Sequence, residues 1–335
     1  MANLFIDPIV MASPQYGCSK DVFEEYISQL LQWQDLSDCA WSKIFFSSKT
    51  IDVLFSEHRY PIWDEVEKII NGFGIDYIQP KDIVVLVDSF LQKFIKIEEW
   101  LSLEEFVYEN ILLAPNFTSP SDPFRSVLGE TLILMVLKSH IENESQDLQL
   151  LITDKQLDKV QVRSTVLLTH FSNGTTLPVE FEVDGSFKCC SEFDELLIKI
   201  NYPYLWANCE SKKGLERLVY LFSSAKKIGL GVANDLNQFE FGLHFIATTT
   251  DLQFKNERTK CERLLRAMSD LILDLNLGST HALRAGAGGN NPQIESNGFK
   301  AWRKDIDYEY HLHYWKSGTQ IIFANVVTHN DFEIN

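Results

Sequence analysis

Three histidines near the end of the chain are the residues whose spacing best suits chemistry. His311 and His313 are two positions apart in Tyr310–Trp315, a run typical of a strand, so both should point to one face. His329 follows the next strand-like run, Gln320–Val327, and could meet either of them. Imidazole titrates near neutral pH and can act as a general acid or base. We predict a catalytic set of His311, His313 and His329.

Cationic and aromatic side chains surround these histidines. The candidates for substrate binding are Lys300, Arg303, Lys304 and Tyr314, which could contact phosphates or stack on a base. Two simpler interpretations stay open. Arg303 and Lys304 alternate with Asp305 and Asp307 and could form surface ion pairs, and a histidine on a sheet is often only structural.

Other ligand sites are less well supported. An H-x-H pair with a third histidine could hold zinc, but no nearby cysteine strengthens that alternative, so no metal or other cofactor is predicted. The loop Ala285–Gly289 lacks the Lys-Ser/Thr ending of a phosphate-binding P-loop and is expected to be a hinge. The six cysteines contain no C-x-x-C pair, which argues against a zinc cage or a disulfide framework.

The elements that must position the histidines can be read from the same region. One helix and four strand-like runs are expected, at Glu257–Leu275 and at Phe239–Ala247, Phe299–Ile306, Tyr310–Trp315 and Gln320–Val327. Gly318 lies in the turn between the last two. This order predicts a small sheet with a helix on one face.

The rest of the chain divides into a helical part and a mixed part. Helical stripes begin after Ser19 and recur at Ile62–Phe73, Asp82–Phe94, Ile97–Leu113 and Pro123–Leu137. A β-hairpin is indicated by Val160–Phe171 and Leu177–Val183, and helices follow at Phe193–Ile200 and Leu215–Lys226. Because 335 residues exceed one ordinary core, we expect an α+β protein of three parts, 1–145, 146–237 and 238–335.

Charge separates these parts. The net charge is −17, yet residues 238–335 hold 10 Lys and Arg against 12 Asp and Glu, whereas residues 1–237 hold 20 against 35. An acidic surface repels nucleic acid, so the 1–237 segment is expected to bind a protein partner. No apolar stretch is long enough to span a membrane and no signal peptide is evident, so we expect a cytoplasmic protein without membrane contact.

The C-terminal sequence resembles the RelE/YoeB-type bacterial toxins, which are mRNA interferases. Trp302 and Ile306 keep one family spacing, Leu312 and Tyr314 keep a second, and His329 stands fifteen residues after Tyr314. Pro292 and Gly298 also fall near family positions. The resemblance covers about 238–335 and implies a RelE-like fold for that part.

The chemistry implied by this resemblance is metal-free RNA cleavage, in which a 2′-hydroxyl attacks the neighbouring phosphate. The chain departs from the family pattern at functional positions. His311 replaces a family arginine, Tyr310 replaces a histidine, and Asn330 follows His329 where the family has tyrosine. Gln293 or Glu295 would stand near the family's catalytic glutamate.

The resemblance therefore leaves two main hypotheses. The first is an RNA-directed toxin or effector, possessing ribonuclease-like activity against free or ribosome-bound RNA, with a regulatory acidic part, as in a toxin–antitoxin or phage-defence system. The second is an inactive RelE-like binding or scaffold subunit of a larger complex, which the loss of the arginine at His311 favours. A metal-dependent hydrolase is a third alternative.

Overall fold

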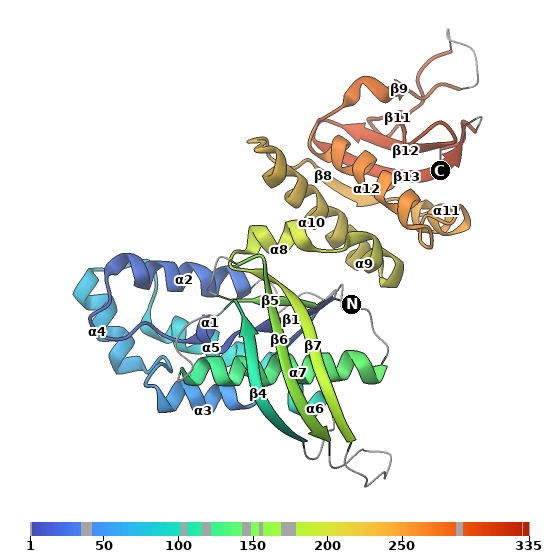
Figure 1. Ribbon diagram of the computed structural model, residues 1–335. Coiled ribbons are helices and arrows are strands. Elements are labelled where there is room, and N and C mark those ends of the chain that lie inside the picture. Colours follow the sequence, from blue (N-terminus) through green and yellow to red (C-terminus); the bar gives the residue numbers. More distant parts are fainter. Residues whose placement is uncertain are drawn as a thin grey trace. The chain divides into compact units, whose positions relative to one another are not determined.

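The computed structural model of the protein (Figure 1) describes residues 2–34, 42–101, 106–115, 122–142, 149–153, 157–168, 179–285, 291–329 and 331–334. It contains both helices and mixed sheets, which confirms the expected α+β class. The chain forms two compact units, Ala2–Leu196 and Leu197–Asn335.

This division corrects the three parts expected from the sequence. The boundary expected at 145 falls inside the first unit, because strands on both sides of it belong to one sheet. The boundary expected at 237 falls inside the second unit, where Lys226 forms an ion pair of 2.5 Å with Asp270 and Glu216 accepts a hydrogen bond from the backbone N–H of Phe241. The middle segment is therefore shared between the two units.

The division also sharpens the separation of charge. Residues 1–196 contain 14 Lys and Arg against 32 Asp and Glu, a balance of −18, and residues 197–335 contain 16 against 15, a balance of +1. The first unit therefore carries the whole net negative charge of the chain.

The first unit is built on a seven-stranded sheet with the strand order β3-β2-β1-β5-β7-β6-β4. Its strands are β1 (Ala2–Ile6), β2 (Ser42–Phe46), β3 (Ile95–Lys96), β4 (Phe106–Ala114), β5 (Gln149–Ile152), β6 (Lys159–Leu168) and β7 (Val179–Cys190). The first five in the order are parallel, and β6 runs against both β7 and β4. The expected hairpin is confirmed, since Leu168 pairs with Val179, while its turn lies outside the described residues.

The helices of the first unit are α1 (Pro8–Met11), α2 (Lys20–Gln34), α3 (Lys49–Ser56), α4 (Trp63–Phe73), α5 (Pro80–Lys93), α6 (Ile97–Leu101) and α7 (Pro123–Glu142), and α8 (Phe193–Lys199) spans the division. The expected helices at α2, α4, α5, α7 and α8 are confirmed. The expected helix Ile97–Leu113 is wrong beyond Leu101, because the chain there pairs with β6 as strand β4.

Helix α7 lies against the sheet and fills its core (Figure 1). Val136 on this helix belongs to the same core cluster as Val162 and Phe187 of the hairpin strands, and all three are fully buried. Gly185 on β7 permits the close approach, because an added Cβ would overlap Cγ2 of Val136. The helix and the hairpin are therefore closely fitted to each other.

The second unit contains the predicted C-terminal sheet. Its elements are helices α9 (Tyr202–Asn208), α10 (Lys212–Leu230), α11 (Phe245–Asp251) and α12 (Arg258–Ile272), a short 3₁₀ turn at Leu277–Ser279, and strands β8 (Gln238–Phe241), β9 (Thr280–Ala282), β10 (Glu295–Ser296), β11 (Phe299–Asp305), β12 (Tyr310–Ser317) and β13 (Gln320–Thr328). The strand order is β10-β11-β12-β13-β8, and β9 also pairs with β11. The three antiparallel strands and the turn at Gly318, which has a φ of +57°, are confirmed.

One face of this sheet is covered by helices. Tyr310 receives a hydrogen bond of 3.3 Å from Lys260 of α12, and the N–H of Val326 bonds Thr248 of α11 at 3.1 Å. Because Val326 pairs with Leu312, the side chains of Tyr310, Leu312 and Tyr314 lie on this helix face. The expected strand Phe239–Ala247 is corrected here, since β8 ends at Phe241 and α11 begins at Phe245.

Candidate functional site

His311 lies on the middle strand of the second unit's sheet, on the face opposite to the one that α11 and α12 cover. It lies on β12 between Asp305 of β11 and Val327 of β13, its cross-strand partners. The side chain is 2% exposed. Strand alternation places Arg303, Asp305 and His313 on the same face, which we call the histidine face.

His329 reaches His311 from the end of β13. Nδ1 of His329 lies 3.0 Å from Nε2 of His311, and the ring centroids are 4.9 Å apart. Unlike His311, His329 is exposed. The structure therefore brings two of the three predicted histidines into direct contact, with one of them open to solvent.

Asp305 extends this contact on the other side of His311. Its Oδ1 lies 2.9 Å from Nδ1 of His311, at ion-pair distance although not aligned as a hydrogen bond, and both atoms are buried. Its Oδ2 lies 3.7 Å from Nε2 of His281, which is half exposed. Asp305, His311 and His329 thus form a continuous chain, which we call the Asp-His-His chain.

The charge of Asp305 favours one arrangement of the protons in this chain. A carboxylate favours a proton on Nδ1 of His311, which leaves its Nε2 as an acceptor for the Nδ1–H of His329. Nε2 of His329 is then free to take a proton from a bound group. Burial lowers the pKa of His311; Asp305 opposes this shift, and Arg303 and His329 add to it. His311 is therefore neutral at physiological pH.

His313 has a different surrounding, although it lies on the same face. It is fully buried, and its Nδ1 donates a hydrogen bond of 2.9 Å to the backbone carbonyl of Glu333. Burial lowers the pKa of His313 to about 4, against the opposing effect of that hydrogen bond. The predicted cluster of three imidazoles is thus a contacting pair with a third, sealed histidine beside it.

The predicted substrate-binding residues do not gather at the histidines. Arg303 alone lies on the histidine face, directly across from His313. Lys300, Lys304 and Tyr314 share the opposite side of the sheet by alternation. The expectation that three cations and Tyr314 surround one site is therefore corrected.

Each of these three residues has a local role. Lys304 is 3% exposed and donates to the backbone carbonyl of Asn276, and burial lowers its pKa. Nζ of Lys300 lies 3.5 Å from Oε1 of Glu295. Burial raises the pKa of Tyr314. Since Glu295 is exposed on β10 and the side chain of Gln293 bonds the carbonyl of Ala301, neither is held at the histidine pair by a described contact.

Several residues of the histidine face were missed by the sequence reasoning. Asp305 was treated as a surface ion-pair partner of Arg303 and Lys304, although counting outward from the tight connection at 306–309 pairs it with His311. His281 and Asn325 carried no signal of their own, because their neighbours come from β9 and β13 through tertiary pairing.

A metal site was one of the alternatives left open. Within the described parts of the chain, no three His, Cys, Asp or Glu side chains are grouped so that they could hold a metal ion. The three histidines in particular are divided between the Asp-His-His chain and the bond to Glu333.

Among the residues that the structure describes, no helix is long and apolar enough to cross a membrane.

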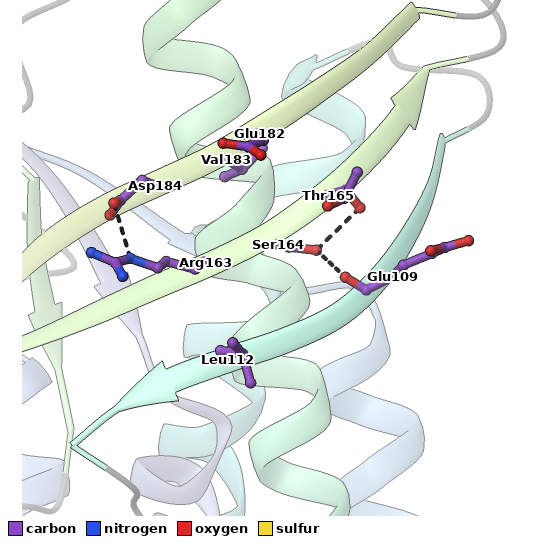
Figure 2. A pocket seen from close by; sticks show the side chains of 8 residues that line it. All are labelled: Glu109, Leu112, Arg163, Ser164, Thr165, Glu182, Val183 and Asp184. Carbon is purple, nitrogen blue, oxygen red and sulfur yellow. Dashed lines mark hydrogen bonds and ion pairs between the residues drawn. The ribbon is translucent and has the colours of Figure 1, made fainter.

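The first unit has a hollow of about 440 Å³ on the outer surface of β4, β6 and β7 (Figure 2). It follows the irregular pairing of β4 between Glu109 and Leu112. Three acidic residues line it, and its arginine, Arg163, forms an exposed ion pair of 3.0 Å with Asp184. The hollow is open and acidic and offers no general acid and base in contact.

A second polar group in this unit follows the parallel strands. Asp7, Ser47 and Thr153 come directly after β1, β2 and β5, and all are buried. They lie at the carboxyl ends of the parallel strands, where open sheets commonly bind ligands at the point at which the strand order reverses. Here Thr153 donates to Asp7 at 2.9 Å and Ser47 to Glu98 at 2.6 Å. These groups satisfy one another, so the histidine face remains the stronger candidate site.

Comparisons of the chain with known protein families, curated proteins and solved structures find no match.

Proposed function

We propose that the second unit is an RNA-directed, ribonuclease-like effector and that the acidic first unit binds a protein partner that controls it. The observation that carries the proposal is the exposed imidazole of His329 at the end of the Asp-His-His chain. A buried carboxylate contact behind a pair of imidazoles is suited to proton transfer at neutral pH.

The proposed reaction uses the chain as follows. Nε2 of His329 takes the proton of a ribose 2′-hydroxyl, whose oxygen attacks the adjacent phosphorus. The bond from phosphorus to the 5′-oxygen breaks, and that oxygen takes a proton from water, leaving a 2′,3′-cyclic phosphate and a 5′-hydroxyl. The positive charge gained by His329 is shared with His311 and stabilised by Asp305.

The direct test is cleavage of free and ribosome-bound RNA by the purified protein. Replacing His329 by alanine should lower the rate roughly 10²–10⁴-fold, the usual contribution of a general acid–base group. His244, which lies at the N-terminal end of α11 on the same unit, offers a matched control, because its replacement removes an imidazole outside the chain. If His329→Ala/His311→Ala cleaves as fast as the unmodified protein, the catalytic proposal is wrong.

A second function is favoured by the charges of the histidine face. A ribonuclease of this type needs several positive charges at the phosphate, whereas the described strands place one cation, Arg303, on the histidine face. The alternative is therefore an inactive RelE-like binding or scaffold subunit. It predicts RNA or protein binding without the cyclic phosphate end, which analysis of the product termini would reveal.

Partner binding is assigned to the first unit because of its balance of −18. Such a charge attracts a basic partner over about the Debye length, which is ~8 Å at physiological salt. Association measured against salt concentration should weaken steeply as salt rises. An association independent of salt would contradict an electrostatic docking role.

A further inference from the structure

Two buried donors on the histidine face converge on a single oxygen. Nδ1 of His313 and Nδ2 of Asn325 lie 2.9 and 3.0 Å from the backbone carbonyl oxygen of Glu333. The two residues are cross-strand partners on β12 and β13 and are 0% and 2% exposed. We call this donor pair the oxygen site.

The carbonyl of Glu333 satisfies the two donors of the oxygen site but leaves one acceptor atom on each side chain unbonded within the described residues. Nε2 of His313 and Oδ1 of Asn325 are buried and have no hydrogen-bond partner among the described residues. Because buried polar atoms are nearly always bonded, such exceptions commonly mark a place where a ligand or a water is bound. Both atoms are acceptors, because Nδ1 of His313 carries the proton, so they suit a donor such as water or a hydroxyl group and are not bonded by the carbonyl of Glu333.

That occupant is the C-terminal segment Asp331–Ile334, and its hold is local. The N–H of Asp331 bonds the carbonyl of Thr328 at 3.0 Å, and Oδ1 of Asp331 accepts from the N–H of Glu333 at 2.8 Å. The side chain of Glu333 itself is exposed. The segment is thus a tight turn that presents one backbone oxygen to the sheet.

The surroundings of the oxygen site suit a negatively charged oxygen better than a carbonyl. Arg303 stands across from His313 and disfavours protonation of both His311 and His313 by its charge. The Asp-His-His chain lies two residues along the same strand. The charge of Asp331 also acts on His313, so an anionic oxygen would gain from the arginine once Asp331 leaves with the segment, and it would lie beside the group proposed to act as base.

We propose that the oxygen site binds a phosphate oxygen of the RNA and that the segment Asp331–Ile334 occupies it as an internal substitute, which closes the site until it is displaced. The choice of a phosphodiester rests on the proposed function, whereas the oxygen site and its occupant rest on the contacts above. Substrate and segment then compete for the same two donors.

The test follows the imidazole signals of His313 by NMR in the full chain, in Asp331→Ala and in a chain that ends at Asn330. The probes are inorganic phosphate and a short 2′-O-methyl oligoribonucleotide, which lacks the attacking hydroxyl. Loosening or removing the segment should tighten binding about tenfold, the factor given by two hydrogen bonds of modest strength. Glu333→Ala keeps the backbone oxygen and should bind like the full chain, and Asn325→Ala in the shortened chain should lose the gain.

The outcomes separate this inference from the proposed function. A His313 signal that ignores both probes in the shortened chain would overturn the inference, and so would equal affinities in the full and shortened chains. Response to phosphate alone would keep the oxygen site as an anion site and overturn its assignment to RNA. Binding of both probes without cleavage of ordinary RNA would leave the inference standing and remove the catalytic proposal.

Discussion

At the scale of single residues, the histidine face shows how position in a sheet gives identical side chains different properties. His311 and His313 are two residues apart on β12, yet His311 contacts Asp305 and His329, while His313 is sealed under a backbone carbonyl. Desolvation lowers the pKa of both. Only the first is linked to an exposed group that can exchange protons with a ligand.

Removing the charge of Asp305 tests the Asp-His-His chain without any assumption about substrate. The carboxylate raises the pKa of His311, so Asp305→Asn should lower that pKa further. NMR titration of the imidazoles measures it directly. Asp307→Asn is a matched control, because Asp307 pairs with Arg263 and caps the connection to β12. Equal titration of His311 in both variants would mean that Asp305 is not coupled to the pair.

Acid should destabilise the second unit through His313. Its pKa is about 4 when folded and about 6.5 when unfolded, so the unfolded state binds the proton more tightly. Stability is therefore full above pH 6.5 and is lost as the pH falls toward 4, by roughly 3 kcal/mol for this group. The charges of Arg303 and Asp331, and that of His311 once acid protonates it, adjust this value. His313→Gln should flatten the loss in denaturant unfolding measured between pH 4 and 7, and an unchanged slope would count against a buried neutral imidazole.

At the scale of elements, α7 lies so close to the hairpin of the first unit that an added methyl group at Gly185 would not fit. Gly185→Ala should destabilise this unit by about 1–3 kcal/mol, because the added methyl overlaps Val136 in a filled core. Gly72→Ala on α4, where an added Cβ meets open space, should be neutral or stabilising in thermal unfolding. Adding Val136→Ala should recover part of the loss in Gly185→Ala. A full loss without recovery would assign the effect to the backbone.

The elements also show what sequence reasoning can and cannot reach. The hairpin at β6 and β7 and the strands β11 to β13 were predicted because apolar and polar residues alternate along these strands and turn residues separate them. Strands β1 and β2 were missed, since short strands buried on both faces show no alternation.

The candidate site follows the same rule. A contact of His329 with one of the two strand histidines was foreseen, because the start of β12 and the end of β13 lie together at the end of the pair away from the turn at Gly318. The burial of Lys304 was not foreseen, since it depends on which face α12 and the turn at Asn276 cover. Local patterns specify which residues share a face, and tertiary packing decides which face is open.

At the scale of the molecule, the second unit begins well before residue 238, where the third part was expected to start. Helices α9 and α10 pack against α12, so a fragment 238–335 would expose that surface of α12. A fragment 197–335 should therefore unfold cooperatively in circular dichroism, while 238–335 should melt broadly or aggregate. Replacing Lys226 by methionine in the longer fragment should cost less than removing the two helices. Equal cooperativity of both fragments would place the folding boundary at 237 after all.

The uneven charge of the two units has a further consequence for encounters in solution. A nearby polyanion such as RNA pushes the unit of −18 away and exerts little force on the unit of +1, so it applies a torque to the chain as a whole. Collisions in which the second unit leads are favoured before any contact forms. A basic protein attracts the first unit instead, so RNA and a basic protein would meet different units of the same molecule first.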